Sequence, residues 1–216
     1  MNEKTAKQPT APSLAEQAYE MLENRLVKLE LAPGSIVSEG LLIDMVGLGR
    51  TPVREAMQRL AHQDLIRVLP RKGLMIVPIE PSDLLQVLQV RKRLERLIVR
   101  LAALNARDEQ RSGLSAIARA LTISHDSFEE FLDLDREMDT LLDASAGNPY
   151  AAAAVAPLRT HCRRFWFANS NQLRLSDAIS AHSTMLRLIA RRDYKGAQKA
   201  SDGVIGVIER LVAGAG

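Results

Sequence analysis

The sequence predicts a mainly α-helical protein with two parts: a small N-terminal winged helix-turn-helix and a C-terminal antiparallel six-helix bundle. Three observations support this prediction. Aromatic residues make up only 4% of the 216 residues, while Leu, Ala and Arg are abundant, which favours helices over a β-sandwich or barrel. Apolar residues recur at helical spacing along most of the chain. Two β-prone runs lie close together near residues 65–77, on either side of a turn.

Composition sets the broad class of protein. The single cysteine, Cys162, rules out an internal disulfide framework and fits a reducing compartment. No apolar run approaches the 18 residues of a membrane span. Residues 1–12 are polar, lack the apolar core of a signal peptide and are expected to form a disordered tail. We therefore expect a cytoplasmic protein, and the net charge of +3 is compatible with nucleic-acid binding without requiring it.

In the first third of the chain, the pattern predicts two helices that precede an arginine-rich helix. Residues 13–29 repeat leucine and alanine at about one-turn spacing, and Ile36-Val37 is expected to pair as a very short strand. Ser38 is suited to cap a helix over residues 39–45, because its hydroxyl can accept from an otherwise unpaired N–H. Residues 47–49 then make a glycine-containing turn. Two short helices joined in this way indicate a helix-turn-helix.

A helix is predicted next, within residues 49–60, and its sequence contains residues that typically start a helix. Thr51 is expected to be its N-cap and Pro52 its first residue, where a missing N–H costs nothing. Arginines crowd the first turn, where the helix dipole does not favour cations, so an external anion such as DNA would explain them. A solvated amphipathic helix is the alternative for this segment alone. The outward face carries Arg50, Arg54, Glu55, Gln58, Arg59 and His62.

A β-hairpin is predicted next, with strands over residues 65–68 and 75–77 and a basic tip. From residue 50 to residue 72 there are six basic and two acidic side chains, so the segment carries a charge of +4. An ordinary solvated turn is the alternative for the tip. Together with the basic helix, however, the tip favours DNA contact.

Residues 13–79 resemble the winged helix-turn-helix of the GntR family of bacterial transcription regulators. The resemblance is carried by Leu31-Ala32-Pro33-Gly34, Ser38-Glu39, Arg50-Thr51-Pro52-Val53-Arg54-Glu55-Ala56, Leu60, Leu65-Ile66 and Arg71-Lys72-Gly73, while Gly49 departs from an expected serine. It implies that Arg50 and Arg54 contact bases or phosphates and that Gly73 lets the wing enter the minor groove. The predicted DNA-binding residues are Arg50, Thr51, Arg54, Glu55, Gln58, Arg59, Arg71, Lys72 and Gly73.

Residues 80–83 mark a boundary, and a second domain is predicted over residues 82–213. Its periodicity predicts six helices and no strands, which is typical of an antiparallel bundle. Their expected bounds are residues 84–106, 108–122, 126–144, 149–168, 175–191 and 194–212.

This second half resembles the FCD-type ligand-binding domain of the FadR branch of the same family, closest to its shorter, VanR-like members. The resemblance is carried by Val90-Arg91, Leu94-Glu95, residues 135–142, residues 146–149, Ala181-His182 and Leu188. Such domains often hold a divalent metal with an Asp, a His four residues later and two further His. Here Asp135 and His182 match, whereas Asp139 and Val204 stand at the second and fourth positions.

Two hypotheses remain open for this site. Asp135, Asp139 and His182 could hold one divalent metal such as Zn²⁺, or the metal has been lost and the aspartates are solvated or paired with Arg91 or another arginine. Arg91 lies within an apolar stripe and needs an anion, which the aspartates or a small organic acid could supply. The predicted effector-binding residues are Arg91, Asp135, Asp139, Asn148 and His182.

The sequence thus predicts a ligand-responsive, homodimeric repressor that binds a pseudo-palindromic operator and responds to a small carboxylate. The alternatives are a regulator that senses the metal ion itself, a structural DNA-binding protein without a ligand, and a metal hydrolase. Against an enzyme, the chain has no nucleophile elbow, Gly-rich phosphate loop or dense His/Glu ligand motif.

Overall fold

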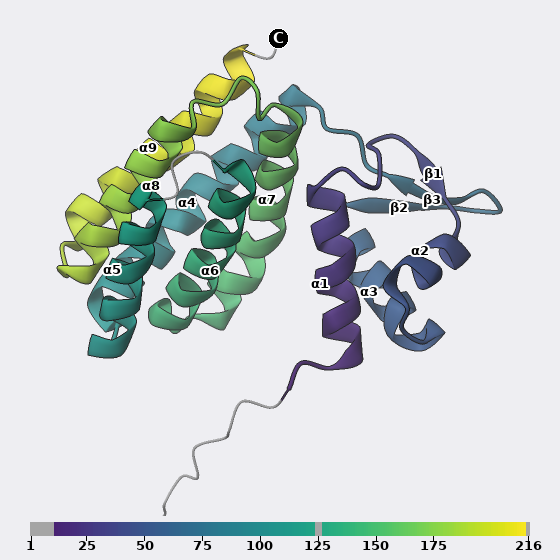
Figure 1. Ribbon diagram of the computed structural model, residues 1–216, viewed down its shortest axis with the longest axis horizontal. Coiled ribbons are helices and arrows are strands. Elements are labelled where there is room, and N and C mark those ends of the chain that lie inside the picture. Colours follow the sequence, from purple (N-terminus) through teal and green to yellow (C-terminus); the bar gives the residue numbers. More distant parts are fainter. Residues whose placement is uncertain (1–10, 124–126, 215–216) are drawn as a thin grey trace, which may run out of the picture. The chain divides into compact units, whose positions relative to one another are not determined.

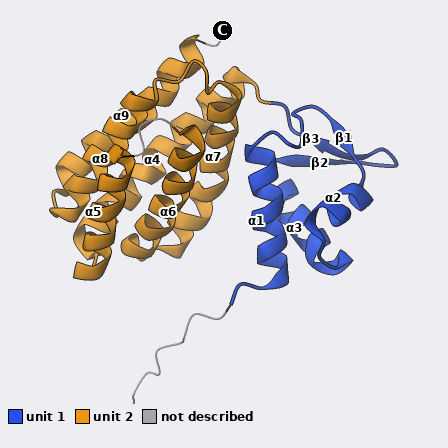
Figure 2. Ribbon diagram, viewed as in Figure 1, with its two compact units in different colours: residues 1–78 blue, residues 79–216 orange. Residues whose placement is uncertain are grey.

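The computed structural model describes residues 11–123 and 127–214. Residues 1–10 of the expected disordered tail, residues 1–12, lie outside the described residues. The chain divides into two compact units, residues 1–78 and residues 79–216 (Figure 2). Each unit is described by itself below. No described helix is both long enough and apolar enough to cross a membrane.

The first unit contains three helices (Figure 1): α1 spans Leu14–Val27, α2 spans Glu39–Val46 and α3 spans Arg50–His62. Ser38 caps α2 as predicted, since its hydroxyl accepts a hydrogen bond of 3.1 Å from the Leu41 N–H. Gly47 then ends α2 in the left-handed conformation, with φ of 70°. The predicted helix-turn-helix is therefore present.

A three-stranded antiparallel sheet completes this unit: β1 (Ile36–Val37), β2 (Ile66–Leu69) and β3 (Gly73–Ile76). The strand order is β1-β3-β2. β2 and β3 form the predicted hairpin, with Leu69 opposite Gly73 at its closed end, and the predicted two-residue strand pairs with β3. The hairpin is the wing.

The core of the first unit is apolar and joins all its elements, because each contributes the buried stripe that its period predicts. Helix α1 packs on α3, and α3 in turn contacts β2. Fully buried members of this core include Leu22, Leu26, Val53, Leu60, Leu65 and Ile76. This packing fixes the start of α3 and the hairpin on one scaffold.

The second unit is the predicted six-helix bundle. Its helices are α4 (Pro81–Asn105), α5 (Asp108–Ile123), α6 (Phe128–Ala146), α7 (Pro149–Ala168), α8 (Leu175–Ala190) and α9 (Tyr194–Gly214). Helix α4 packs against α6, α7, α8 and α9, while α5 packs against α6 and α8 (Figure 1). Charged side chains on α4, α6 and α7 therefore meet inside the bundle.

Candidate DNA interface and buried ionic cluster

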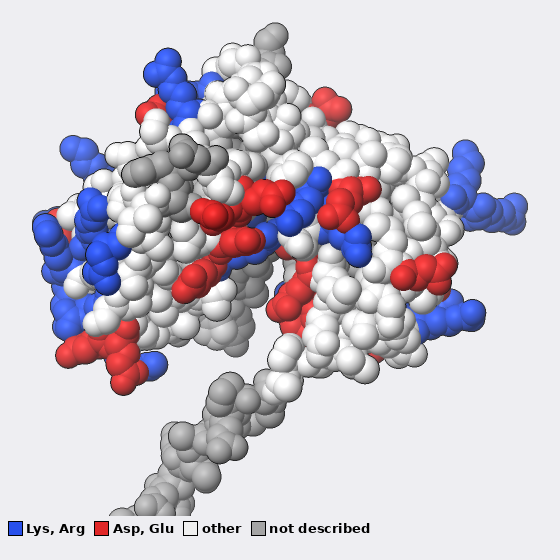
Figure 3. Space-filling view, viewed as in Figure 1, with Lys and Arg blue, Asp and Glu red and all other residues white. Residues whose placement is uncertain are grey.

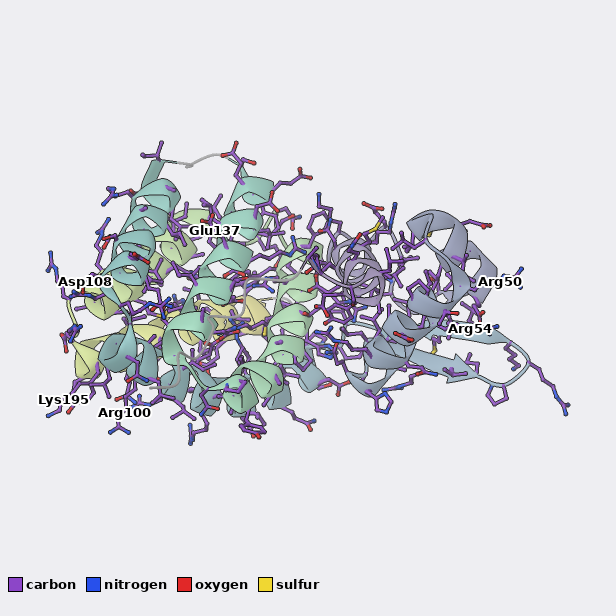
Figure 4. The ribbon with its side chains drawn as sticks, turned by 90° about the horizontal axis from the view of Figure 1, so that it is seen from below. Arg50, Arg54, Arg100, Asp108, Glu137 and Lys195 are labelled. Carbon is purple, nitrogen blue, oxygen red and sulfur yellow. The ribbon has the colours of Figure 1, made fainter. Side chains whose placement is uncertain are left out.

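The first turn of α3 presents two exposed arginines. In Figure 4, Arg50 and Arg54 lie at the same edge of the first unit. The Nε atom of Arg54 donates to Oε1 of Glu39 on α2 over 2.6 Å, and both side chains remain exposed, at 60% and 41%. The two arginines are therefore placed where their guanidinium groups can reach an external anion.

The predicted N-cap of α3 is wrong. The helix begins at Arg50, and its N-cap is Gly49, which makes no side-chain hydrogen bond. The extended backbone of Gly49, with φ of −60° and ψ of 159°, starts the helix before Thr51 can cap it. Pro52 still lies in the first turn, where its missing N–H breaks no helical hydrogen bond. Thr51 is exposed, and its hydroxyl does not cap the helix.

Arg59 lies differently from the other arginines of α3. Its Nη1 atom donates to Oε2 of Glu16 over 2.7 Å, and its guanidinium carbon lies 3.6 Å from the centre of the Tyr19 ring. Both partners belong to α1, so Arg59 joins α1 to α3 by an ion pair and a cation–π contact. The contact of Arg59 with DNA stays a prediction. The contacts with Glu16 and Tyr19 do not favour it, because they hold the guanidinium against α1. Glu55 and Gln58 are exposed on the same helix.

The tip of the wing carries Arg71 and Lys72, both exposed. Arg71 adopts a left-handed backbone with φ of 64°, and the Lys72 N–H donates to the Leu69 carbonyl to close the turn. Gly73 has φ of 110°, and a Cβ added there would lie 2.6 Å from the Val37 carbonyl oxygen. The sheet itself therefore requires glycine at this position, independently of its predicted approach to a minor groove.

Figure 3 shows one group of basic side chains at the tip of the wing and another beside the turn that joins α2 to α3. These groups lie at two places on one compact unit. Two lysine- or arginine-bearing elements on one scaffold can contact the phosphates of a duplex while a helix reads its bases. The geometry supports DNA binding by α3 and the wing.

The bundle holds a buried ionic cluster centred on Arg163 of α7. Its Nε atom donates to Oδ2 of Asp135 over 2.7 Å, and its Nη2 atom donates to Oδ2 of Asp139. Both aspartates belong to α6 and lie one helical turn apart. On the far side of Asp135, its Oδ1 atom lies 3.4 Å from Nε2 of His182 on α8. The predicted residues 135, 139 and 182 are therefore brought together, with an arginine between the two carboxylates.

A second arginine of α7 extends the cluster to α4. The Nε and Nη2 atoms of Arg159 donate to the two carboxylate oxygens of Glu95, over 2.9 and 3.0 Å. Arg159 also pairs with Asp139 and Asp143, and Arg91 donates to Glu95 over 3.1 Å. These contacts tie α4, α6 and α7 together. A buried charge without a partner is very costly, so removing any one of these side chains would destabilise the bundle by leaving its partner unpaired.

The protonation of the cluster follows from its crowding. Burial would raise the pKa of Glu95, but Arg159 and Arg91 lower it to about 2. Burial likewise opposes ionisation of Asp135, yet Arg163 and His182 hold its pKa well below the usual range. Burial raises the pKa of Asp139 to about 6, against the opposite effect of Arg159 and Arg163. Glu95 and Asp135 are therefore firmly ionised at neutral pH.

A small cavity of about 10 Å³ adjoins this cluster. Such a space holds about one water molecule. Its polar lining includes Arg91, Asp139 and His182, three of the predicted effector residues, and its apolar lining includes Met138 and Met185. Val204, which stands at the fourth metal position of the resemblance, contributes to the same wall.

Two predicted effector residues do not line the cavity: Asp135, which pairs with Arg163, and Asn148, which caps a helix. The Oδ1 atom of Asn148 accepts from the Ala151 N–H over 3.1 Å and caps α7, and Asn148 does not line the cavity. The sequence did not indicate Glu39, Glu95 or Asp143 as partners of the arginines. Glu95 could have been noticed, because its position four residues after Arg91 allows a pair on one helix face. Glu39 and Asp143 gave no such local signal.

Comparisons with known proteins agree with this geometry. The family model of the FCD domain matches residues 86–206, and that of bacterial regulatory proteins, gntR family, matches residues 14–76. The chain is 25% identical over 186 residues to the HTH-type transcriptional repressor GlaR of Escherichia coli K12, a match covering 81% of this chain and 84% of GlaR. It is also 36% identical over 90 residues to an HTH-type transcriptional regulator of Agrobacterium vitis, a match covering 41% of this chain and about half (53%) of that relative.

The fold is also found among solved structures. The structure of E. coli McbR/YncC superposes with a TM-score of 0.82 at 18% identity, covering 95% of this chain and 99% of that one. At this identity the likeness shows the fold alone. Since the matched family models and relatives are those of regulators, the metal-hydrolase hypothesis is set aside.

Proposed function

Because the chain belongs to the GntR family of bacterial regulatory proteins and carries the FCD domain, and so is a DNA-binding transcription regulator, we propose that it is a homodimeric repressor released from its operator by a small organic acid. The observation that carries the proposal is the pair of exposed arginines, Arg50 and Arg54, at the start of α3, on the same unit as the basic wing. An Arg fork matches guanine O6 and N7 in the major groove.

An apolar stripe on the solvent side of α4 supports the homodimer. Val90, Leu97 and Leu104 are 53%, 38% and 46% exposed and recur every seven residues. The half-buried Leu94 and Leu101 fall between them, which completes the alternating three- and four-residue spacing of a coiled-coil seam. A two-fold axis places a surface against its own copy, so a second α4 is the matching occupant. Such a dimer requires two half-sites in the operator.

The interior of the bundle supports an effector site that opens on binding. Arg91 and His182 line a cavity of about 10 Å³, whereas ligand pockets span roughly 300–1,000 Å³. An acid therefore enters only if the walls move. Met138 and Met185 suit this movement, because unbranched methionine side chains repack easily.

This opening supplies the coupling between ligand and DNA. A ligand shifts a two-state equilibrium only by its different affinity for the two states. The closed bundle has no room for an acid, so the acid binds the open bundle alone. In this proposal the protein binds its operator with the bundle closed. The acid then lowers the affinity for DNA, and DNA lowers the affinity for the acid by the same factor.

The test is a release assay. The labelled duplex from upstream of the protein's own coding region is bound, and acetate, succinate, citrate and benzoate are titrated while fluorescence anisotropy is followed. One of these acids is expected to lower the anisotropy of the wild type. Arg91→Lys keeps the charge but loses the bidentate fork, so it should bind DNA equally and need more acid for release. Equal release of both proteins would contradict the proposed site.

A further inference from the structure

The metal-binding pattern that the sequence suggested does not fit the donor atoms of this site. Three of the four carboxylate oxygens of Asp135 and Asp139 already face guanidinium groups: two face Arg163 and one faces Arg159 at 3.1 Å. In the described residues, no group of three or more His, Cys, Asp and Glu side chains is arranged to hold a metal ion. Asp135 and Asp139, which would have to bind the metal ion, are already paired with the guanidinium groups of two arginines.

The position of that cation is specific. Arg163 reaches from α7 to two carboxylates that lie one turn apart on α6, and Asp135 in turn faces His182 of α8. Three helices thus converge on one positive charge. A divalent ion held by Asp135, Asp139 and His182 would neutralise the same two carboxylates and join α6 to α8. The guanidinium does the same electrostatic work and ties the carboxylates to α7 instead.

Charge and space both oppose adding a metal while Arg163 remains. The Arg163 and Arg159 side chains are 8% and 2% exposed, so their repulsion of a second cation is poorly screened. The neighbouring cavity has room for about one water. Val204, buried at the remaining family position, offers no donor atom.

Two buried polar atoms of the site have no hydrogen-bond partner among the described residues. Oδ1 of Asp135 and Nε2 of His182 are buried and make no hydrogen bond within the described residues, although they lie 3.4 Å apart. Nδ1 of His182 contacts the Ala178 carbonyl at 2.7 Å, which leaves Nε2 directed at the carboxylate. Together with Asp139, these atoms are of the oxygen and nitrogen types that divalent transition metals bind, and loss of the guanidinium would free their side chains to rearrange around an ion.

We propose that the Arg163 guanidinium is the built-in cation of this bundle and takes the place of a metal ion. The site is therefore metal-independent, and deleting the guanidinium converts it into a metal site formed by Asp135, Asp139 and His182. This inference concerns the bundle alone, so its failure would leave the proposed DNA binding and acid response untouched.

The test compares the wild type with Arg163→Ala and Arg163→Lys. Thermal unfolding is followed with EDTA, with ZnCl₂ and with CoCl₂, and bound Co²⁺ is read from its visible absorption. The wild type is expected to keep its Tm in all three solutions and to bind no Co²⁺. Arg163→Ala should melt lower with EDTA, regain Tm with Zn²⁺ and bind about one Co²⁺ per chain. Arg163→Lys should stay metal-free, since it retains the charge.

Arg96→Ala is the matched control, because Arg96 pairs with Asp202 on the bundle surface over 2.5 Å. It should acquire no metal. Folded Arg163→Ala that binds no Co²⁺ would overturn the proposal, and so would stoichiometric Zn²⁺ binding that raises the Tm of the wild type. If Arg163→Ala does not fold, the wild type and Arg163→Lys decide: absence of binding in both supports the proposal, and binding in either contradicts it.

Discussion

The Nε atom of Arg54 lies 2.6 Å from Oε1 of Glu39, so an arginine of α3 expected to contact DNA is held by an acid of α2. Both side chains are well exposed, so the pair contributes little to stability, about 0–1 kcal/mol. Its consequence concerns DNA binding. A carboxylate beside a guanidinium that contacts DNA would repel the duplex and orient the arginine at the same time.

Glu39→Gln is therefore expected to raise the affinity for a scrambled duplex severalfold. The ratio of the affinity for the operator to the affinity for the scrambled duplex should become smaller. The negative charge is lost, and with it the ion pair that orients Arg54. Fluorescence anisotropy on both duplexes measures the change. Weaker binding to the scrambled duplex would contradict this account of Glu39.

Gly73→Ala is expected to destabilise the first unit by more than about 1 kcal/mol, because the new Cβ would lie 2.6 Å from the Val37 carbonyl at a φ of 110°. Urea unfolding measures the loss. Gly47→Ala is the control: its φ is also positive, at 70°, but a Cβ there meets nothing within 4 Å. Equal losses in the two variants would show that the contact with Val37 is unimportant.

Leu97→Glu is expected to convert the proposed dimer into monomers and to weaken operator binding, because it puts a charge in the middle of the α4 stripe. Sedimentation velocity gives the oligomeric state. Leu85→Glu is a control on the same helix: Leu85 is 45% exposed but lies about 120° around α4 from Leu97. A dimeric Leu97→Glu protein would exclude this stripe as the interface.

Glu95→Gln is expected to lower stability at pH 7 by about 3 kcal/mol, because Arg91 and Arg159 lose their shared charged partner. The pKa of Glu95 falls from 4.5 in the unfolded chain to about 2 in the folded one. The native state thus binds fewer protons, and the contribution of Glu95 is complete above pH 4.5 and lost as the pH falls toward 2.

Urea unfolding of the wild type and of Glu95→Gln should therefore give a difference that shrinks between pH 4.5 and pH 2. A difference that is constant across this range would mean that the loss comes from packing and not from the carboxylate charge.

The elements of the fold could be predicted because their signals are local. Ser38 caps α2 through its own hydroxyl, and the alternating runs around residues 70–73 define the hairpin. The start of α3 was misplaced because Gly49 and Thr51 both suit a helix start, and the turn after Gly47 decides between them.

The ionic cluster was only partly predictable. Periodicity indicates that Asp135 and Asp139 share a face of α6, and the notion that an arginine pairs with them is confirmed. Which arginine does so depends on the rotation of α7 against α6 and α4. That rotation is set by the packing of the whole bundle, so Arg163 rather than Arg91 meets the aspartates.

The most direct measurement is the binding of wild type and Arg54→Ala to the upstream duplex and to a scrambled one, by fluorescence anisotropy between about 50 and 200 mM salt. The account predicts tight, sequence-selective wild-type binding with a steep salt dependence, and a loss of about 1–3 kcal/mol of selective binding in Arg54→Ala. Arg96→Ala, on the bundle surface, should bind like the wild type. If Arg54→Ala retains full affinity and base preference, the α3 arginine does not read the operator, and the central claim is wrong.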